Sequence, residues 1–92
     1  DCASIEMLDL SENKLTGGVP SSLGKCVKLK KLLLDTNQLE GAVPASELAK
    51  LTALTELSLR KNEGLTITAR GKQEIERAAP KAKFYWPRVV DA

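Results

Sequence analysis

The chain has 92 residues, enough for a single domain, and its 42% hydrophobic and 28% charged residues are an ordinary globular composition. A formal net charge of +2 gives no overall electrostatic case for a nucleic-acid partner or an anionic membrane surface. No run approaches the ~20 apolar residues that a membrane span needs, so we expect no membrane insertion.

The first predicted unit, residues 5–20, reads IEMLDLSENKLTGGVP, and it returns at residues 29–44 as LKKLLLDTNQLEGAVP. A third copy begins at Leu54 and keeps the spacing as far as Asn62, but it lacks the G-x-V-P ending. Self-similarity at a period of about 20 to 29 residues, with the pattern L-x-x-L-x-L-x-x-N-x-L, is the signature of a leucine-rich repeat.

At these residues the chain resembles the leucine-rich repeat family, and the L-x-G-x-V-P segments at 15–20 and 39–44 resemble its plant-type subclass. The resemblance implies an α/β solenoid. A short parallel sheet would line the concave side, with turns and short helices on the convex side and a C-terminal helix plus short strand as a cap.

The leucine spacing supports the same architecture without the family name. Leu8 and Leu10 are two residues apart, as are Leu32 and Leu34, so each pair shares one face of a short strand. A lone strand cannot bury that face, whereas stacked copies form one continuous core. An asparagine follows each strand where the backbone must turn, and we expect its amide to bind unpaired backbone groups; these residues are Asn13, Asn37 and Asn62.

We therefore predict a single leucine-rich repeat domain over residues 1–92, with rungs at about 5–28, 29–53 and 54–80 and a C-terminal cap at about 66–92. Residues after Pro20 and Pro44 are expected to form short turns of helix. A longer helix is predicted over 69–80, with Thr68 as its N-cap and Pro80 as its stop.

Residues 83–86, KFYW, are predicted to be a final short strand whose three aromatic residues plug the open end of the core. A ligand-binding aromatic patch is the alternative. The opening residues begin in the middle of a repeat, which leads us to expect an N-terminal truncation. Neighbouring repeats or another subunit would then cover this end of the stack.

Cys2 and Cys26 occupy equivalent positions in adjacent copies, and Leu51 fills that position in the third. We expect two small buried thiols, with a disulfide as the open alternative. Two cysteines without any histidine do not make a metal site, so no metal or cofactor is expected.

Catalytic residues are also missing from the sequence. It contains no histidine base, no Gly-rich phosphate loop and no nucleophile with a recognisable activating partner. Carboxylates such as Glu6, Asp9 and Glu12 are expected to serve contact or solubility, and we predict that the chain is not an enzyme.

The residues that alternate with the inward leucines should face outward on the concave sheet. Leu33 breaks the polar character of that face at its centre and is predicted to be an apolar anchor. Two ion pairs are expected beside it, Lys31 with Glu56 and Asp35 with Arg60. The predicted protein-contact residues are Met7, Asp9, Ser11, Lys31, Leu33, Asp35, Glu56, Ser58 and Arg60.

The charges are unevenly distributed along the chain. Residues 1–24 contain four acids against Lys14, whereas residues 60–92 contain eight bases against four acids. The two ends of the solenoid should therefore differ in sign.

The predicted function is a non-catalytic module that binds a protein or peptide partner, a role that the family resemblance implies. One alternative is the repeat region of a receptor or receptor-kinase ectodomain, and another is a structural subunit docked in a larger complex. The asparagines are not followed by Ser or Thr two residues later, and the predicted cap lacks a cysteine pair. Both absences slightly favour an intracellular or organellar setting over an extracellular one.

Overall fold

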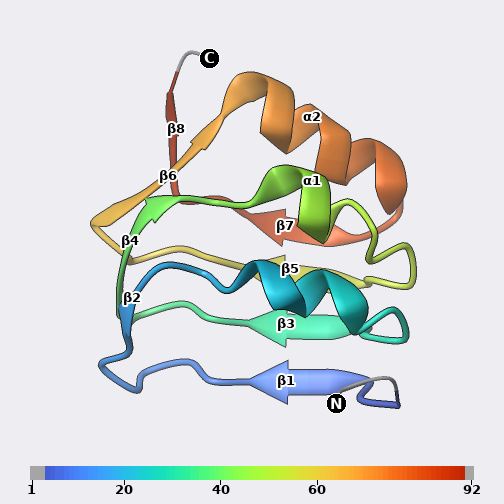
Figure 1. The fold of residues 1–92 in the computed structure, drawn as a ribbon, viewed down its shortest axis with the longest axis horizontal. Coiled ribbons are helices and arrows are strands. Elements are labelled where there is room, and N and C mark those ends of the chain that lie inside the picture. Colours follow the sequence, from blue (N-terminus) through green and yellow to red (C-terminus); the bar gives the residue numbers. More distant parts are fainter. Residues whose placement is uncertain (1–3, 91–92) are drawn as a thin grey trace.

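Four short parallel strands lie side by side in the computed structural model, which describes residues 4–90 (Figure 1). Their order in the sheet follows the chain, so each repeat adds its strand beside that of the previous repeat. The strands are β1 (Met7–Asp9), β3 (Lys31–Leu33), β5 (Glu56–Ser58) and β7 (Lys83–Tyr85).

The register of this sheet stacks the equivalent leucines as predicted. Leu8 pairs with Leu32, Leu32 with Leu57, and Leu57 with Phe84 of the fourth strand. Leu32 and Leu57 are fully buried because both of their neighbours in the column cover them. The predicted α/β arrangement of parallel strands in consecutive rungs is therefore confirmed.

A second parallel sheet, which the sequence analysis assigned to turns, forms where each rung leaves the first sheet. Its order is β2-β4-β6-β8. Gly17 and Gly41 adopt φ angles of 82° and 86° with open space around them, so glycine suits these positions for its backbone freedom. The strands are β2 (Thr16–Gly17), β4 (Gln38–Ala42), β6 (Gly64–Thr68) and β8 (Arg88–Val90).

Short helices return the chain along the other side of each rung. The 3₁₀ helix η1 (Ser21–Lys25) and helix α1 (Ala45–Leu48) follow the two prolines, as predicted. Helix α2 (Ala69–Ala78) ends before Pro80, and its predicted N-cap is present because Thr68 Oγ1 accepts a hydrogen bond from Gly71 N–H at 2.9 Å. Burial of Ile75 against the core stabilises the later turns of α2.

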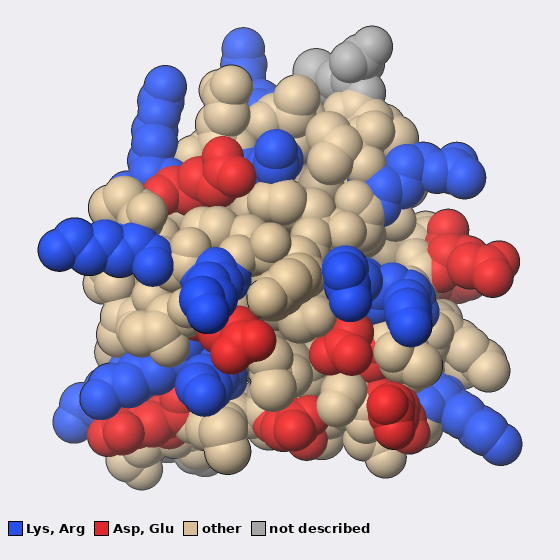
Figure 2. All heavy atoms as spheres, turned by 180° about the vertical axis from the view of Figure 1, so that it is seen from behind, with Lys and Arg blue, Asp and Glu red and all other residues tan. Residues whose placement is uncertain are grey.

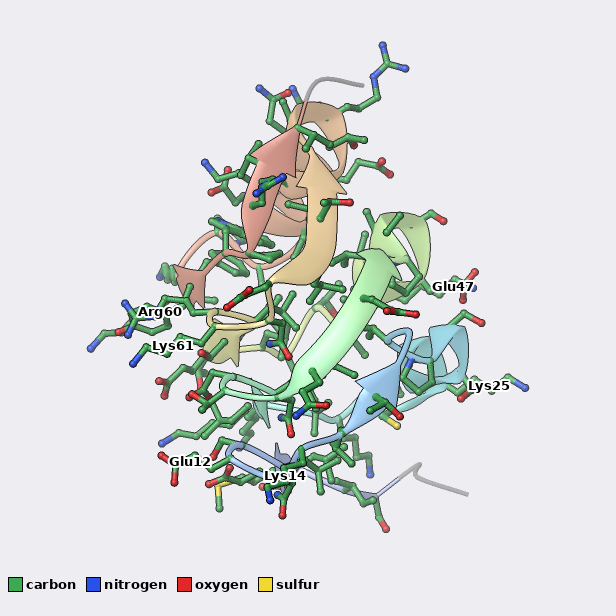
Figure 3. All side chains as sticks on the ribbon, turned by 90° about the vertical axis from the view of Figure 1, so that its left-hand side faces the viewer. Glu12, Lys14, Lys25, Glu47, Arg60 and Lys61 are labelled. Atoms are coloured by element: carbon green, nitrogen blue, oxygen red, sulfur yellow. The ribbon has the colours of Figure 1, made fainter. Side chains whose placement is uncertain are left out.

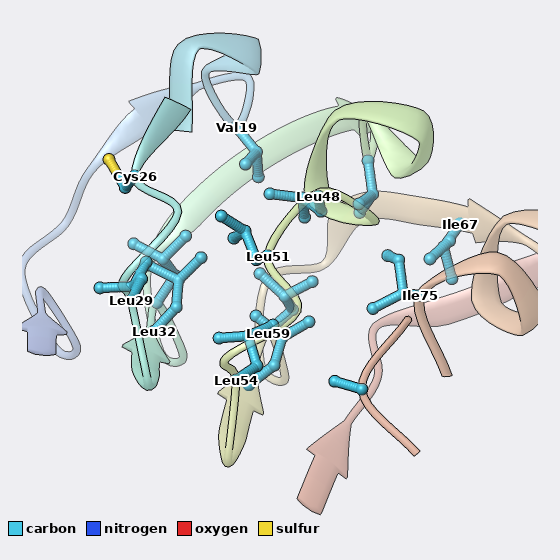
Figure 4. Close-up of a cluster of buried hydrophobic side chains, with 14 of the residues drawn as sticks. Val19, Cys26, Leu29, Leu32, Leu48, Leu51, Leu54, Leu59, Ile67 and Ile75 are labelled. Carbon is cyan, nitrogen blue, oxygen red and sulfur yellow. The ribbon is translucent and has the colours of Figure 1, made fainter. Parts of the chain in front are cut away.

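The core is a ladder of leucines between the two sheets and the helices (Figure 4). Each fully buried leucine contributes about 1.5–3 kcal/mol relative to an exposed one. Burial is incomplete in the first rung, where Leu8, Leu10, Leu15 and Leu23 are only partly covered. The fully buried side chains are Leu29, Leu32, Leu48, Leu51, Leu57, Leu59, Leu65, Ile67 and Ile75.

Cys26 is buried, with 3% of its surface exposed, and it is disulfide-bonded. The expectation of a free thiol is therefore wrong at Cys26, where the disulfide alternative holds. Cys2, the other cysteine of the sequence, lies outside the described residues.

The asparagines connect successive rungs, as their position after each strand suggested. Asn37 donates to the carbonyl of Leu34 in its own rung at 3.0 Å and to that of Leu10 in the preceding rung at 2.9 Å. Its Oδ1 accepts from the amides of Asn13 and Leu15. Asn62 repeats this arrangement against the second rung, with bonds to Leu34 O and from Leu39 N–H.

Candidate functional site

The first sheet presents two columns of outward-facing residues, in the order that the period predicted. The register brings six of the nine predicted contact residues into these columns. One column is Met7, Lys31 and Glu56, and the other is Asp9, Leu33 and Ser58. We call this surface the strand face.

The remaining three predicted residues lie just beyond the strand ends. Glu12 N–H donates to Asp35 O at 3.1 Å, and Thr36 N–H donates to Arg60 O at 3.0 Å. These bonds keep the rungs adjacent past the strands, so the predicted third column of Ser11, Asp35 and Arg60 borders the strand face.

The outward residues differ widely in accessible surface. Met7 is 61% exposed, Leu33 is half-buried, and Ser58 is only 7% exposed. Ser58 therefore offers little area to a partner, since it lies in register between Leu33 and Tyr85. The apolar area of the strand face comes mainly from Met7 and Leu33.

One of the two predicted ion pairs is present. Lys31 Nζ lies 4.0 Å from Glu56 Oε1, a long and exposed contact of the kind that contributes ~0.2–1 kcal/mol at most. The predicted pair of Asp35 with Arg60 does not form among the described side chains. The Arg60 guanidinium instead lies 5.1 Å from the centre of the Tyr85 ring, a cation–π geometry.

Asp9 and Ser11 bind each other at the edge of the strand face. The Asp9 carboxylate accepts from Ser11 Oγ at 2.6 Å and from Ser11 N–H at 3.1 Å. The side-chain hydrogen bond from Ser11, followed by the backbone one, lowers the pKa of Asp9 below its ordinary value. Asp9 therefore stays ionised to lower pH than a free aspartate.

The fourth strand extends both columns, and the sequence analysis missed this extension. Lys83 is in register with Glu56, and Tyr85 with Ser58. The alternation in Lys83-Phe84-Tyr85 matches that of Glu56-Leu57-Ser58 and is the signal that could have identified it. Phe84 packs inward, where its ring stacks on Trp86 at 4.9 Å between centroids and 12° between planes.

The turns between the two sheets form a series of hollows. Glu12, Lys14, Arg60 and Lys61, which line them, lie along one edge of the molecule (Figure 3). The first edge hollow, of about 420 Å³, is lined by Glu12, Lys14, Thr36, Asn37 and Gln38. The second, of about 330 Å³, includes Gln38, Glu40, Lys61 and Glu63. The third, of about 640 Å³, includes Arg60, Lys61, Glu63, Trp86, Pro87 and Arg88.

Arg60 and Lys61 project together from this edge, whereas Lys25 and Glu47 lie on the opposite side (Figure 3). No cluster of three or more His, Cys, Asp or Glu side chains suited to a metal occurs within residues 4–90. The helices of this same range are all too short and too polar to cross a membrane.

The repeat pattern also matches a known family. The leucine-rich repeat family model matches residues 4–26, a segment that contains β1, β2 and η1. No curated protein shows a significant match to the chain. Leucine-rich repeats are generally non-catalytic and typically act as protein-interaction modules. Residues 4–26 are therefore a leucine-rich repeat, and the stacked parallel strands with short helices are consistent with a leucine-rich repeat solenoid.

Proposed function

We propose that the chain is a non-catalytic protein-interaction module and that the strand face is its contact surface. The observation that carries the proposal is the position of Leu33, a half-buried leucine in register between Asp9 and Ser58. Lys31, Glu56 and Asp35 place charge around it. An apolar centre with a polar rim is typical of protein interfaces.

The size of this surface limits what it can bind alone. A stable interface buries ~800 Å² on each partner, and strands of three residues provide a narrow face. A peptide in extended conformation, or a larger partner that also contacts neighbouring repeats, fits these dimensions better than a globular protein docked here alone.

Substitution of Leu33 by glutamate tests the proposal. Peptides are first selected for binding to the protein from a displayed random library, and their affinities for variants are then measured. We expect Leu33→Glu to weaken binding by more than about tenfold, because it places a charge at the centre of the contact. Val27→Glu is the matched control, since Val27 is 52% exposed and lies outside the strand face.

Val27→Glu should change the affinity by less than about twofold, well under the tenfold that 1.4 kcal/mol represents. Circular dichroism is used to check that both variants are folded. If selected peptides bind Leu33→Glu as they bind the unmodified protein, the strand face is not the contact surface.

We further propose a plant-type layout for the whole chain. The L-x-G-x-V-P segments at 15–20 and 39–44 support this subclass, and the rungs are taken as 5–28, 29–53 and 54–80. Residues 66–92 serve as the cap. Burial of Ile75 and the stacking of Phe84 on Trp86 against the core support this last assignment.

A second candidate role is that of a subunit whose first rung docks against another rung. The exposed interior of the first rung supports this role. An apolar hollow of about 260 Å³ opens there among Leu8, Leu10, Leu15 and Leu23. Asn13 is exposed, and its amide donates to Ser11 O at 2.9 Å, whereas Asn37 and Asn62 also bond to a preceding rung. A further leucine-rich rung stacked on β1 would offer Asn13 carbonyl and amide groups like those that Asn37 and Asn62 bind in their preceding rungs.

Hydrogen exchange on the native assembly separates the two roles. Docking through the first rung predicts that the amides of β1 become protected while those of β3 and β5 exchange as before. Protection of the β3 and β5 amides without added protection of β1 contradicts the docking role and favours the interaction module.

The disulfide at Cys26 supports the receptor-ectodomain alternative, because stable disulfides belong mainly to oxidising compartments. Mass spectrometry of the protein from its native source, after alkylation without reduction, tests this setting. Alkylation of Cys26 under these conditions contradicts it.

A further inference from the structure

The three edge hollows lie along the same edge of the molecule but differ in charge. The first places Glu12 beside Lys14, and the second places Glu40 and Glu63 around Lys61. Among residues 4–90, the third is lined by the cations Arg60, Lys61 and Arg88 and by one carboxylate, that of Glu63. The third hollow is therefore the most cationic of the three.

The three cations of the third hollow are available to a ligand. The ion pairs between described residues involve Lys30, Lys31, Lys50 and Lys72, and none involves these three cations. Arg60 is held by its contact with the Tyr85 ring, 5.1 Å from the ring centre. A guanidinium fixed in this way loses less conformational entropy when it binds a carboxylate in bidentate geometry.

The third hollow also has an apolar wall. Trp86 and Pro87 line it, and the stack of Trp86 on Phe84 fixes the indole ring. The wall suits an apolar side chain next to an acidic one, since aromatic rings supply large contact area with few rotatable bonds.

We propose that the third edge hollow binds an acidic peptide segment. Its carboxylates bind Arg60, Lys61 and Arg88, and a neighbouring apolar side chain packs on Trp86. This inference rests on the proposed function. It specifies an acidic peptide as the part of the partner that binds at the C-terminal end of the strand face.

The opposite end disfavours the same segment. Asp9, Glu12 and Asp35 supply carboxylates near the β1 and β3 turns, and these repel an acidic peptide at low ionic strength. On the face drawn in Figure 2, most acidic side chains lie in the lower part, which is the β1 end of Figure 1. The acidic partner is thereby directed to the third hollow.

The test uses a short peptide with alternating glutamate and leucine residues, and the same peptide with glutamine in place of glutamate. Trp86 is the single tryptophan of the chain, so its fluorescence reports binding at the hollow directly. We expect the glutamate peptide to change this fluorescence, to bind at least about tenfold more tightly than the glutamine peptide, and to weaken as salt is raised.

Charge-reversal variants test whether the glutamate peptide binds at the third hollow. Arg60→Glu and Arg88→Glu are each expected to weaken the glutamate peptide by more than about tenfold. Lys25→Glu is the matched control, an exposed cation on the opposite side of the molecule with the same change of charge (Figure 3). It should leave the affinity within about twofold, because Lys25 lies on the opposite side of the molecule and salt screens exposed charges that are far apart.

Equal affinity of the two peptides, equal weakening by Lys25→Glu, or unchanged Trp86 fluorescence overturns the inference. These results are distinguishable from failure of the proposed function. Library peptides that lose affinity for Leu33→Glu but not for Arg60→Glu retain the strand face as a contact surface and remove only the acidic-segment assignment.

Discussion

Asn37 satisfies backbone groups in two successive rungs through a single side chain. Its amide nitrogen donates to Leu34 O and Leu10 O, and its oxygen accepts from Leu15 N–H at 2.9 Å. The side chain is 8% exposed, so water cannot replace these bonds easily. Asparagine supplies both a donor and an acceptor at one site, which leucine of similar size cannot do.

Replacement of Asn37 by leucine is therefore expected to lower the free energy of unfolding by at least about 3 kcal/mol, since several buried backbone groups lose their partners. Asn13→Leu is the matched control in the preceding rung, where the asparagine is exposed. Its effect should stay within about 0.5 kcal/mol. Chemical denaturation measures both values, and equal losses would contradict the account.

At the scale of elements, the packing of α2 depends on a glycine in its first turn. A Cβ atom at Gly71 would lie 2.8 Å from Ala45 Cβ of α1 and 3.1 Å from Thr68 Oγ1. The absence of a side chain lets α2 approach α1 while Thr68 caps the helix. Helix propensity alone would favour alanine by about 1 kcal/mol.

We expect Gly71→Ala to destabilise the protein by about 1–3 kcal/mol despite this propensity, because the overpacked Cβ must displace α1 or the cap. Gln73→Ala in the same helix is the control, since Gln73 is exposed and should change the stability by under about 0.5 kcal/mol. Thermal denaturation distinguishes the outcomes. A rise in the melting temperature of Gly71→Ala would show that the contact is relieved without cost.

The elements also explain which parts of the fold the sequence could predict. Leucines two residues apart identify β1, β3 and β5, because a buried strand face leaves a local pattern. The second sheet leaves this pattern only in β6, where Leu65 and Ile67 are buried, since β2 is only two residues long and contains Gly17. Stacking of neighbouring rungs imposes this pairing, and one rung read alone cannot reveal it.

The same distinction applies to the candidate site. The columns of the strand face could be predicted from the repeat period, because the backbone register pairs equivalent residues of successive repeats. The contact of Arg60 with Tyr85 could not, because the spacing from Glu56 to Lys83 departs from the repeat and concealed the register of the predicted final strand against β5. The third edge hollow depends on that register and was missed with it.

At the scale of the whole molecule, burial increases from the first rung toward the third. Leu8 and Leu10 are partly covered, whereas Leu57 and Leu59 are fully buried. In addition, β5 pairs with strands on both sides, while β1 ends the described sheet. Local stability in a repeat protein follows such nearest-neighbour contacts.

Native-state hydrogen exchange is therefore expected to show slower exchange in β5 than in β1. The difference should exceed about tenfold in rate, because it reflects incomplete burial of two leucines at ~1.5–3 kcal/mol each when fully buried. Nuclear magnetic resonance resolves the individual amides. Equal protection of β1 and β5 would indicate that the chain opens as one cooperative unit.

The asparagine bonds make adjacent rungs depend on each other in both directions. Asn62 donates to Leu34 O of the second rung, and its oxygen accepts from Leu39 N–H of that same rung. Removal of the earlier rung would therefore leave an asparagine amide without a carbonyl, and removal of the later rung would leave a backbone amide without an acceptor. Shortened versions of this protein should accordingly lose stability whichever end is trimmed.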